Sequence, residues 1–139
     1  MGLLSRLFRP GEPGTHAPPS DAIKQAIVLL AMSRNFDGLA VQLRSKNPHV
    51  RVFTIDAVVQ ASQIRSLGGG QMELSADNPF DPRGVGLLIP LLDDGDAAVR
   101  KRADAALTSI ANSPRGGHMH AEVARALEAY RASNANLAP

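Results

Sequence analysis

Two histidines separated by one residue, His118 and His120, are followed by Glu122, and side chains of these types can ligate a metal ion. In a helix, however, residues i and i+2 point in diverging directions, and no second cluster of ligands occurs elsewhere in the sequence. The chain has no cysteine, which excludes disulfides, thiolate zinc sites and cysteine nucleophiles. We interpret the histidines as the solvated start of a helix and expect neither metal nor cofactor.

A glycine-rich stretch, Gly68-Gly69-Gly70-Gln71, has the composition of a phosphate-binding loop. It follows a predicted helix rather than a strand, and it lacks the Gly-Lys-Ser/Thr ending of such loops, so we interpret it as a helix stop. No carboxylate pair, Ser–His pair or nucleophile elbow lies in a context that would activate it, because the aspartates cluster at predicted helix caps and turns. The sequence therefore predicts a non-enzyme without catalytic residues.

Basic residues allow two interpretations. Lys and Arg number 15 and Asp and Glu 13, so the net charge is only +2. Arg51 and Arg100 each follow a predicted inward valine, and carboxylates such as Asp93, Asp94 or Asp96 could pair with them in a structural role. Alternatively, a basic surface could neutralise nucleic-acid phosphates or an acidic peptide; it would comprise Arg44, Lys46, His49, Arg51, Arg65, Arg100, Lys101 and Arg102.

The composition favours packed helices, because 44% of the residues are hydrophobic and only 4% are aromatic. At 139 residues the chain can form one domain with its own core. We expect a flexible tail over residues 1–20, a helical domain over 21–133 and a disordered end over 134–139. No apolar run approaches the roughly 18 residues of a membrane span, so a soluble, cytoplasmic protein is expected.

Hydrophobic periodicity and capping residues predict about six helices. The first starts at the cap Ser20 and stops near Arg34, and the second is capped by Asp37 and ends at Ser45. Asn47-Pro48 starts a third helix that runs to about Ser66, and an ordered loop from Gly68 to Pro82 follows. The remaining helices are expected from Arg83 to Leu92 with a kink at Pro90, from the cap Asp96 to about Asn112, and from about Met119 to Ala132.

An internal repeat links the second and third of these helices with the fourth and fifth. A shift of 49 residues places Leu39 on Leu88, Leu43 on Leu92 and Asn47 on Asp96. The same shift also matches apolar or small residues further on; it places Val50-Arg51 on Val99-Arg100, Thr54 on Ala103, Ala57 on Ala106, Val58 on Leu107 and Ala61 on Ile110. Two copies of one helical hairpin are therefore predicted.

The second copy, within Leu87 to Ala111, closely resembles the HEAT repeat, including its bilin-lyase-like bacterial form. The resemblance is carried by LIPLLDDGDAAVR at 88–100 and by the spacing of Ala103, Ala106, Leu107 and Ile110. The first copy, Leu39 to Ala61, resembles a diverged HEAT unit, and its NPHV at 47–50 also resembles a turn of VHS domains. The 49-residue spacing exceeds that of a usual HEAT repeat, and the helices at either end match no consensus.

This resemblance implies an all-α fold, a short, right-handed, armadillo-like α-solenoid that acts as an adaptor. In such stacks the second helix of each hairpin lines the concave side, which binds a protein partner. The partner-binding candidates are Arg44, His49, Arg51, Arg65, Arg100 and Lys101, with binding to a nucleic-acid backbone through Arg51 and Arg100 as the alternative. Homo-oligomer assembly also stays open.

The N-terminal segment of residues 2–9 is amphipathic, because Leu3, Leu4, Leu7 and Phe8 fall at helical spacing while Arg6 and Arg9 point elsewhere. Prolines and glycines at 10–19 indicate a linker. The segment could be a free terminus, a tag that docks on its own or another solenoid, or a weak contact with a membrane surface. It does not match a secretory signal or a myristoylation motif.

Overall fold

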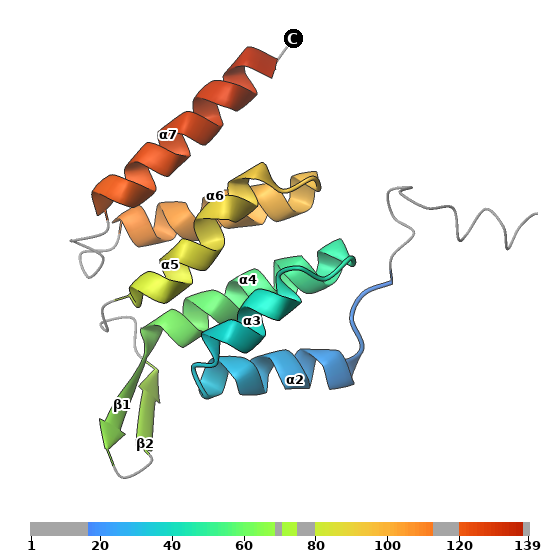
Figure 1. Cartoon of the computed structure of the whole chain (residues 1–139), viewed down its shortest axis with the longest axis vertical. Coiled ribbons are helices and arrows are strands. Elements are labelled where there is room, and N and C mark those ends of the chain that lie inside the picture. The colour runs from blue at the N-terminus through green and yellow to red at the C-terminus, as the bar shows by residue number, and fades with distance from the viewer. Residues whose placement is uncertain (1–16, 69–70, 75–79, 113–119, 138–139) are drawn as a thin grey trace, which may run out of the picture.

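Helices make up most of the structure, a computed structural model that describes residues 17–68, 71–74, 80–112 and 120–137 (Figure 1). The expectation of six helices is confirmed for this part of the chain. Their bounds are α2 Asp21–Met32, α3 Phe36–Gln42, α4 Pro48–Gln63, α5 Pro82–Leu88, α6 Ala97–Asn112 and α7 His120–Leu137. A 3₁₀ helix, η1 (Ile89–Asp93), follows α5, and two strands, β1 (Ile64–Gly68) and β2 (Gln71–Leu74), pair antiparallel.

Capping side chains set most of the helix starts, as predicted. Ser20 accepts a hydrogen bond from the Ile23 amide at 3.3 Å, and Asn47 accepts one from the His49 amide at 2.9 Å with Pro48 at the first helical position. The predicted cap Asp37 is wrong. Asn35 caps α3 instead, by accepting from the Gly38 amide at 2.8 Å.

Arg34 explains why α3 begins so early. Its φ of 53° is left-handed, which lets the Asn35 amide reach the Leu30 carbonyl at 2.9 Å and the Arg34 amide reach the Ala31 carbonyl at 3.0 Å. These two bonds form a Schellman motif, which ends α2 and turns the chain directly into the next helix. The motif normally carries glycine, so the sequence gives no signal for it at this arginine.

The end of α4 corrects a second prediction. The helix stops at Gln63, three residues before Ser66, because the Ser62 carbonyl accepts a hydrogen bond from the Asp81 amide at 3.0 Å and not from a continuing helix. From Ile64 the chain is extended and forms β1, which pairs Ile64 with Leu74 and Ser66 with Met72. The predicted loop thus contains β2, and Gly68 ends a strand rather than stopping a helix.

The single helix predicted from Arg83 to Leu92 is divided near Pro90. Asp81 caps α5 by accepting from the Arg83 amide at 2.9 Å, and the helix ends at Leu88. Pro90 has no N–H to donate to the carbonyl four residues back, so the chain continues as the tighter helix η1. The next helix, α6, begins beyond the cap Asp96, whereas α7 extends to Leu137, past its predicted end at Ala132.

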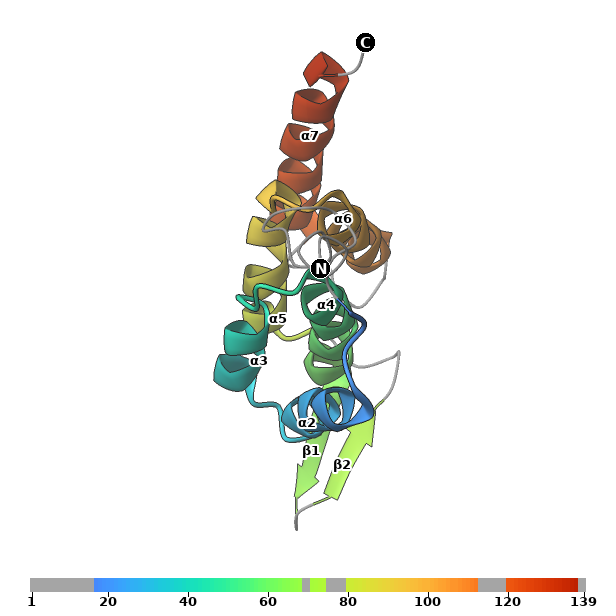
Figure 2. The same ribbon diagram turned by 90° about the vertical axis from the view of Figure 1, so that its right-hand side faces the viewer.

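The helices pack as two rows. α4 lies between α2 and α6 and contacts both, while α3 and α5 cover its other side. Figure 2 shows α3 and α5 on one side of the molecule and α4 and α6 on the other. α2 and α7 lie at opposite ends of the stack (Figure 1), and α7 packs on α6 and η1.

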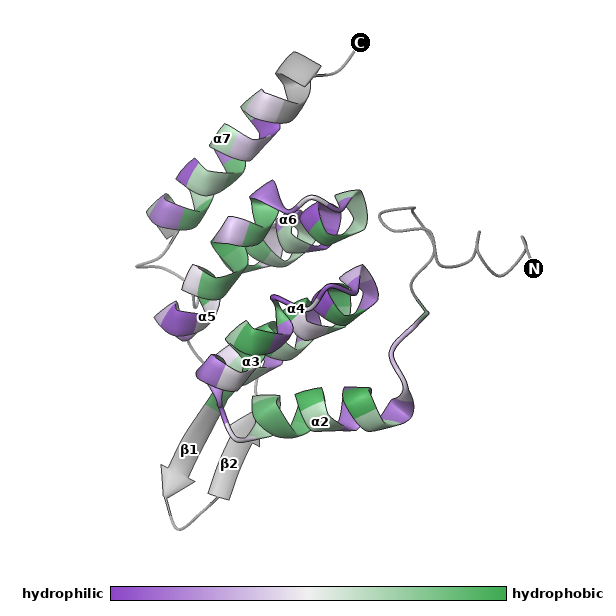
Figure 3. Ribbon diagram, turned by 45° about the vertical axis from the view of Figure 1, so that its right-hand side comes forward, coloured by the Kyte–Doolittle hydropathy of each residue, from purple (hydrophilic) through white to green (hydrophobic). Residues whose placement is uncertain are grey.

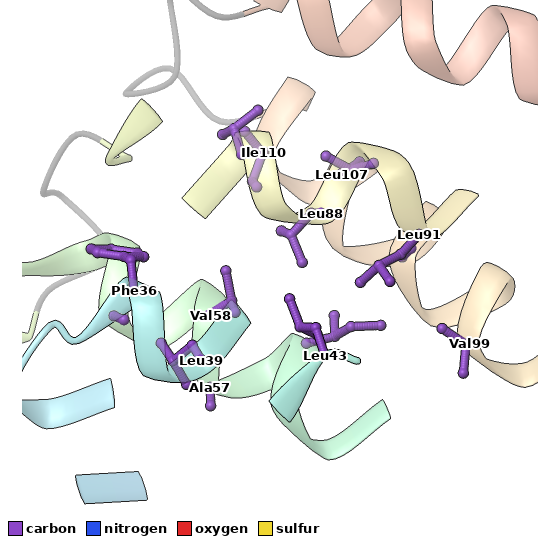
Figure 4. Close-up of a cluster of buried hydrophobic side chains, with 14 of the residues drawn as sticks. Phe36, Leu39, Leu43, Ala57, Val58, Leu88, Leu91, Val99, Leu107 and Ile110 are labelled. Atoms are coloured by element: carbon purple, nitrogen blue, oxygen red, sulfur yellow. The ribbon is translucent and has the colours of Figure 1, made fainter. Parts of the chain in front are cut away.

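One continuous core runs through the stack, from Ile27 to Leu127. Figure 4 shows part of it, between Phe36 and Ile110. The 49-residue shift places buried side chains on buried side chains: Leu39 and Leu88 are both 0% exposed, as are Val58 and Leu107. Thr54, the equivalent of Ala103, keeps its buried hydroxyl satisfied by donating to the Val50 carbonyl at 2.7 Å. The two α4 and α6 hairpins therefore present the same apolar face to the core.

Candidate interaction face

The turns before α4 and α6 are built from the same hydrogen bonds. Asn47 caps α4 at the His49 amide and Asp96 caps α6 at the Ala98 amide, both at 2.9 Å. Two residues earlier, the Ser45 hydroxyl accepts from the Asn47 amide at 3.2 Å, and the Asp94 carboxylate accepts from the Asp96 amide at 2.9 Å. Ser45, Asn47 and His49 are each 49 residues before Asp94, Asp96 and Ala98, so the repeat includes the hydrogen bonds of the turns as well as the core residues.

Arg51 and Arg100 occupy equivalent places against these turns. Nη1 of each arginine donates at 2.7 Å to the carbonyl six residues earlier, Ser45 for Arg51 and Asp94 for Arg100. Nη2 of Arg51 also donates to the Asp94 carboxylate at 2.9 Å, which joins the first hairpin to the second. Among the three carboxylates proposed from the sequence, Asp94 is the one that pairs with Arg51.

The exposed side of α4 carries a stripe at helical spacing. His49, Phe53, Asp56 and Gln60 recur at intervals of four, three and four residues and so share one face of the helix. Three of these side chains are exposed and Phe53 is half-buried. The shift of 49 residues maps this stripe onto exposed residues of α6, which are Ala98, Arg102, Ala105 and Ser109.

One contact shows that these stripes lie on the same side of the molecule, and a second contact joins α4 to α2. The Arg102 guanidinium donates to the Asp56 carboxylate across the α4–α6 boundary, with an Nε–Oδ1 distance of 2.8 Å. On the other flank of α4, Nζ of Lys24 in α2 lies 5.9 Å from the centre of the Phe53 ring. The eight stripe residues of α4 and α6 thus form one surface, which we call the paired-helix face.

The structure distributes the predicted partner-binding residues over several places. His49 belongs to the paired-helix face, and Lys101 is exposed next to Arg102. Arg44 is exposed just after α3, whereas Arg51 and Arg100 are half-buried in the turns. Arg65 lies on β1, outside the face, and the possible docking residues Leu3, Leu4, Leu7 and Phe8 lie outside the described residues.

The sequence predicts partner contacts on exposed positions of the second helix in each hairpin, but it does not single out most residues of the paired-helix face. The 49-residue shift relates core positions, and it also relates the polar positions between them. Asp56, Gln60, Ala105 and Ser109 could have been found in this way, since their stripe is offset from the core stripe along the same helices. Phe53 packs against the edge of the core.

A polar cluster joins the link between α2 and α3 to the start of α5. The Asp81 carboxylate accepts from Arg34 at 2.6 Å and from Arg83 at 2.9 Å, and the Arg83 guanidinium lies 4.5 Å from the centre of the Phe36 ring. Burial acts to raise the pKa of Asp81, but the hydrogen bonds from Arg83 and Arg34 outweigh it, so this pKa lies below its ordinary value. The cluster fastens the start of α5 to the end of α2.

The part of the chain that the structure describes contains no group of three or more His, Asp or Glu side chains placed to hold a metal ion. His118, one of the three residues considered as possible metal ligands, lies outside the described residues. A hollow of about 270 Å³ between η1 and α7 is lined by Asp93, Tyr130 and Ser133 among mostly apolar side chains.

Within the described residues, no helix is both long and apolar enough to cross a membrane.

Comparison with protein-family models, curated proteins and solved structures finds no match to this chain.

Proposed function

We propose that this chain is a small HEAT-like α-solenoid that binds a partner protein through the paired-helix face and catalyses no reaction. The observation that carries the proposal is the repetition of core, caps and arginine contacts at 49-residue spacing in two hairpins. It agrees with the resemblance of residues 87–111 to a HEAT repeat. In that family, equivalent helices stack side by side and present one continuous surface.

The helix order supports the same proposal. α3 and α4 form one hairpin, α5 with η1 and α6 form the next, and the second helices α4 and α6 are in contact. α2 extends the row of second helices at one end, and α7 packs beside η1 at the other. Under the solenoid interpretation, the paired-helix face lies on the side lined by the second helices.

The chemistry of the paired-helix face suits a protein partner. Phe53 and Arg102 are of residue types that are enriched in protein interfaces. Ala98, Ala105 and Ser109 have small side chains, which allow another backbone to come close. The Asp56–Arg102 ion pair is about half exposed, at 50% and 49%, so either charge can be redirected to a partner without leaving a buried charge behind.

A phosphate backbone is a weaker candidate for the ligand. Arg51 and Arg100, the centre of the predicted basic surface, direct guanidinium nitrogens to Asp94 and to turn carbonyls. A phosphate would compete with these internal bonds. If nucleic acid is nevertheless the ligand, affinity will fall steeply with salt, and Arg44→Ala with Lys46→Ala will weaken it; absence of binding at low salt dismisses this alternative.

Site-specific photo-crosslinking tests the proposal. A photoreactive residue is placed at Ala105, on the paired-helix face, and for comparison at Ala124, which is exposed on α7. In cells that naturally contain the protein, we expect one protein adduct at position 105 that is absent at 124. Equal adducts at both positions, or none at 105, contradict the proposal.

The captured protein is then purified and titrated against matched variants. Ala105→Arg places a bulky charge on the face, while Ala124→Arg makes the same change elsewhere. We expect Ala105→Arg to raise the Kd at least tenfold and Ala124→Arg to leave it unchanged. Both sites are exposed, so neither variant should unfold the chain.

A further inference from the structure

α2 has a second apolar face in addition to the one that enters the core. Ile27 and Ala31 are buried at 1% and 0% exposure, whereas Val28, Leu29 and Met32 on the opposite side are 40%, 68% and 47% exposed. Figure 3 shows hydrophobic residues around most of this helix. Lys24, Gln25, Val28 and Leu29 border an apolar hollow of about 310 Å³. A helix that is apolar on both sides is typical of one buried between two neighbours.

The packing of the other helices indicates what kind of neighbour is missing. α4 is preceded in the chain by α3, which packs on it, and α6 is preceded by α5 and η1, which pack on it in the same way. α2 contacts α3 and α4, but no described helix precedes it in the chain. The vacant position therefore fits a short helix from the sequence before α2.

The segment of residues 2–9 has the properties that this position requires. Leu3, Leu4, Leu7 and Phe8 fall on one side of a helix and Arg6 with Arg9 on the other. Its length matches that of α3, which packs on α4 with 7 residues. An isolated helix this short is unstable in water, so the segment needs an apolar surface to order it.

The connection is long enough for this contact. The Asn47 side-chain amide donates to the Ala17 carbonyl at 2.9 Å, which fixes the described chain just before α2. Residues 10–16 can span at most about 23 to 25 Å when extended. α2, with 12 residues, is about 18 Å long. The linker can therefore span more than the length of α2.

We propose that residues 2–9 dock as a helix on the exposed face of α2 in the same molecule, with Leu3, Leu4, Leu7 and Phe8 against Val28, Leu29 and Met32. The added helix and α2 form a further hairpin, which precedes the hairpin of α3 and α4. Val28, Leu29 and Met32 do not belong to the paired-helix face, so both tests of this contact are made without a partner protein.

Disulfide trapping in the full chain tests the contact, because the protein has no cysteine of its own. Leu7→Cys is combined with Leu29→Cys, or with Lys101→Cys on α6 as the control. Under mild oxidation of a dilute sample, we expect an intramolecular disulfide to form at least tenfold faster in the first pair. Equal rates overturn the proposal, and so do disulfide-linked dimers as the main product, which would assign the face of α2 to a second copy.

Thermal unfolding provides a second readout that needs no cysteine. Leu29→Glu and Phe8→Glu should each lower the Tm by roughly 4 °C or more, and the double variant should fall little further because both remove one contact. Arg9→Glu, on the polar side of the segment, should leave the Tm unchanged. An unchanged Tm for Phe8→Glu, or additive losses in the double variant, overturns the proposal.

Discussion

Arg51 and Asp94 form an ion pair of 2.9 Å that connects the start of α4 with the turn before α6. Both side chains are largely buried, at 15% and 12% exposure. Asp94 also makes two hydrogen bonds within its own turn, which links η1 to α6. Its carboxylate accepts from the Asp96 amide, and its carbonyl accepts from Arg100. In the first turn, Ser45 makes the equivalent local bonds, so a carboxylate at 94 adds only the link between hairpins.

Asp94→Ser should therefore remove the ion pair with Arg51 while it keeps the local hydrogen bonds of the turn. Serine at 94 can keep the bond to the Asp96 amide, as Ser45 does for Asn47, while the pair with Arg51 is lost. Because Arg51 then remains half-buried without a carboxylate, we expect the free energy of unfolding to fall by about 1 to 3 kcal/mol. Urea unfolding followed by circular dichroism measures the loss.

A double-mutant cycle separates the pair from the rest of the turn. Arg51→Met should destabilise the natural chain more than it destabilises the Asp94→Ser variant, since the pair is already absent there. Arg100→Met serves as the control, because its described bond is to the Asp94 carbonyl, which serine retains. Equal effects of Arg51→Met in both backgrounds would show that the pair contributes nothing.

Gly84 and Gly86, two residues apart in α5, should respond oppositely to alanine. A Cβ at Gly84 would lie only 1.8 Å from the Ser62 hydroxyl oxygen, whereas one at Gly86 would meet nothing within 4 Å. We expect Gly84→Ala to lower the free energy of unfolding by about 1 to 3 kcal/mol through overpacking. Gly86→Ala should be neutral or stabilising by up to about 1 kcal/mol, because alanine favours the helix. Parallel denaturation curves of the two variants decide.

The lowered pKa of Asp81 predicts that the folded protein loses stability in acid. Folding lowers the pKa of its carboxyl below the ordinary 3.8, so its contribution is complete above that value and is lost as the pH falls through the lowered pKa. Asp81→Asn keeps the cap on the Arg83 amide but removes the charge that Arg34 and Arg83 share. The variant should be less stable at pH 7 and lose less stability between pH 5 and pH 2.

Unfolding free energies measured across that pH range provide the test. Asp56→Asn is the matched control, because it removes a carboxylate that is half exposed in a surface pair. Its effect at neutral pH should be smaller than that of Asp81→Asn. If the stability of Asp81→Asn and of the natural chain declined in parallel, the arginine contacts would not be favouring the charged form of Asp81.

The sequence predicts those parts of the fold that depend on local chemistry. Ser20, Asn47-Pro48 and Asp96 mark helix starts because their side chains hydrogen-bond to amides two or three residues away. Pro90 breaks its helix for an equally local reason, the missing N–H. The 49-residue shift matches core residues because both hairpins face the same interior. These features require no knowledge of how the helices pack.

The errors arise where a distant residue decides the local structure. The Asp81 amide donates to the Ser62 carbonyl, which in a longer α4 would accept from the Ser66 amide. No residue between Ser62 and Ser66 indicates in the sequence that the helix ends there. Arg34 has a left-handed φ, and its side chain forms a 2.6 Å hydrogen bond with Asp81, which is 47 residues away in the sequence. The paired-helix face is also tertiary, since only the packing of α4 on α6 brings Asp56 and Arg102 together.

The Asp56–Arg102 pair should distinguish a structural role from a binding role. The exposed pair is screened by water and salt, so Arg102→Ala should change the free energy of unfolding by less than about 1 kcal/mol, in contrast to Asp94→Ser. If the paired-helix face binds a protein, the same variant should nevertheless raise the Kd for that partner severalfold. Isothermal titration together with urea unfolding gives both quantities. A large loss of stability without a change in affinity would make Arg102 a structural residue and remove it from the proposed interface.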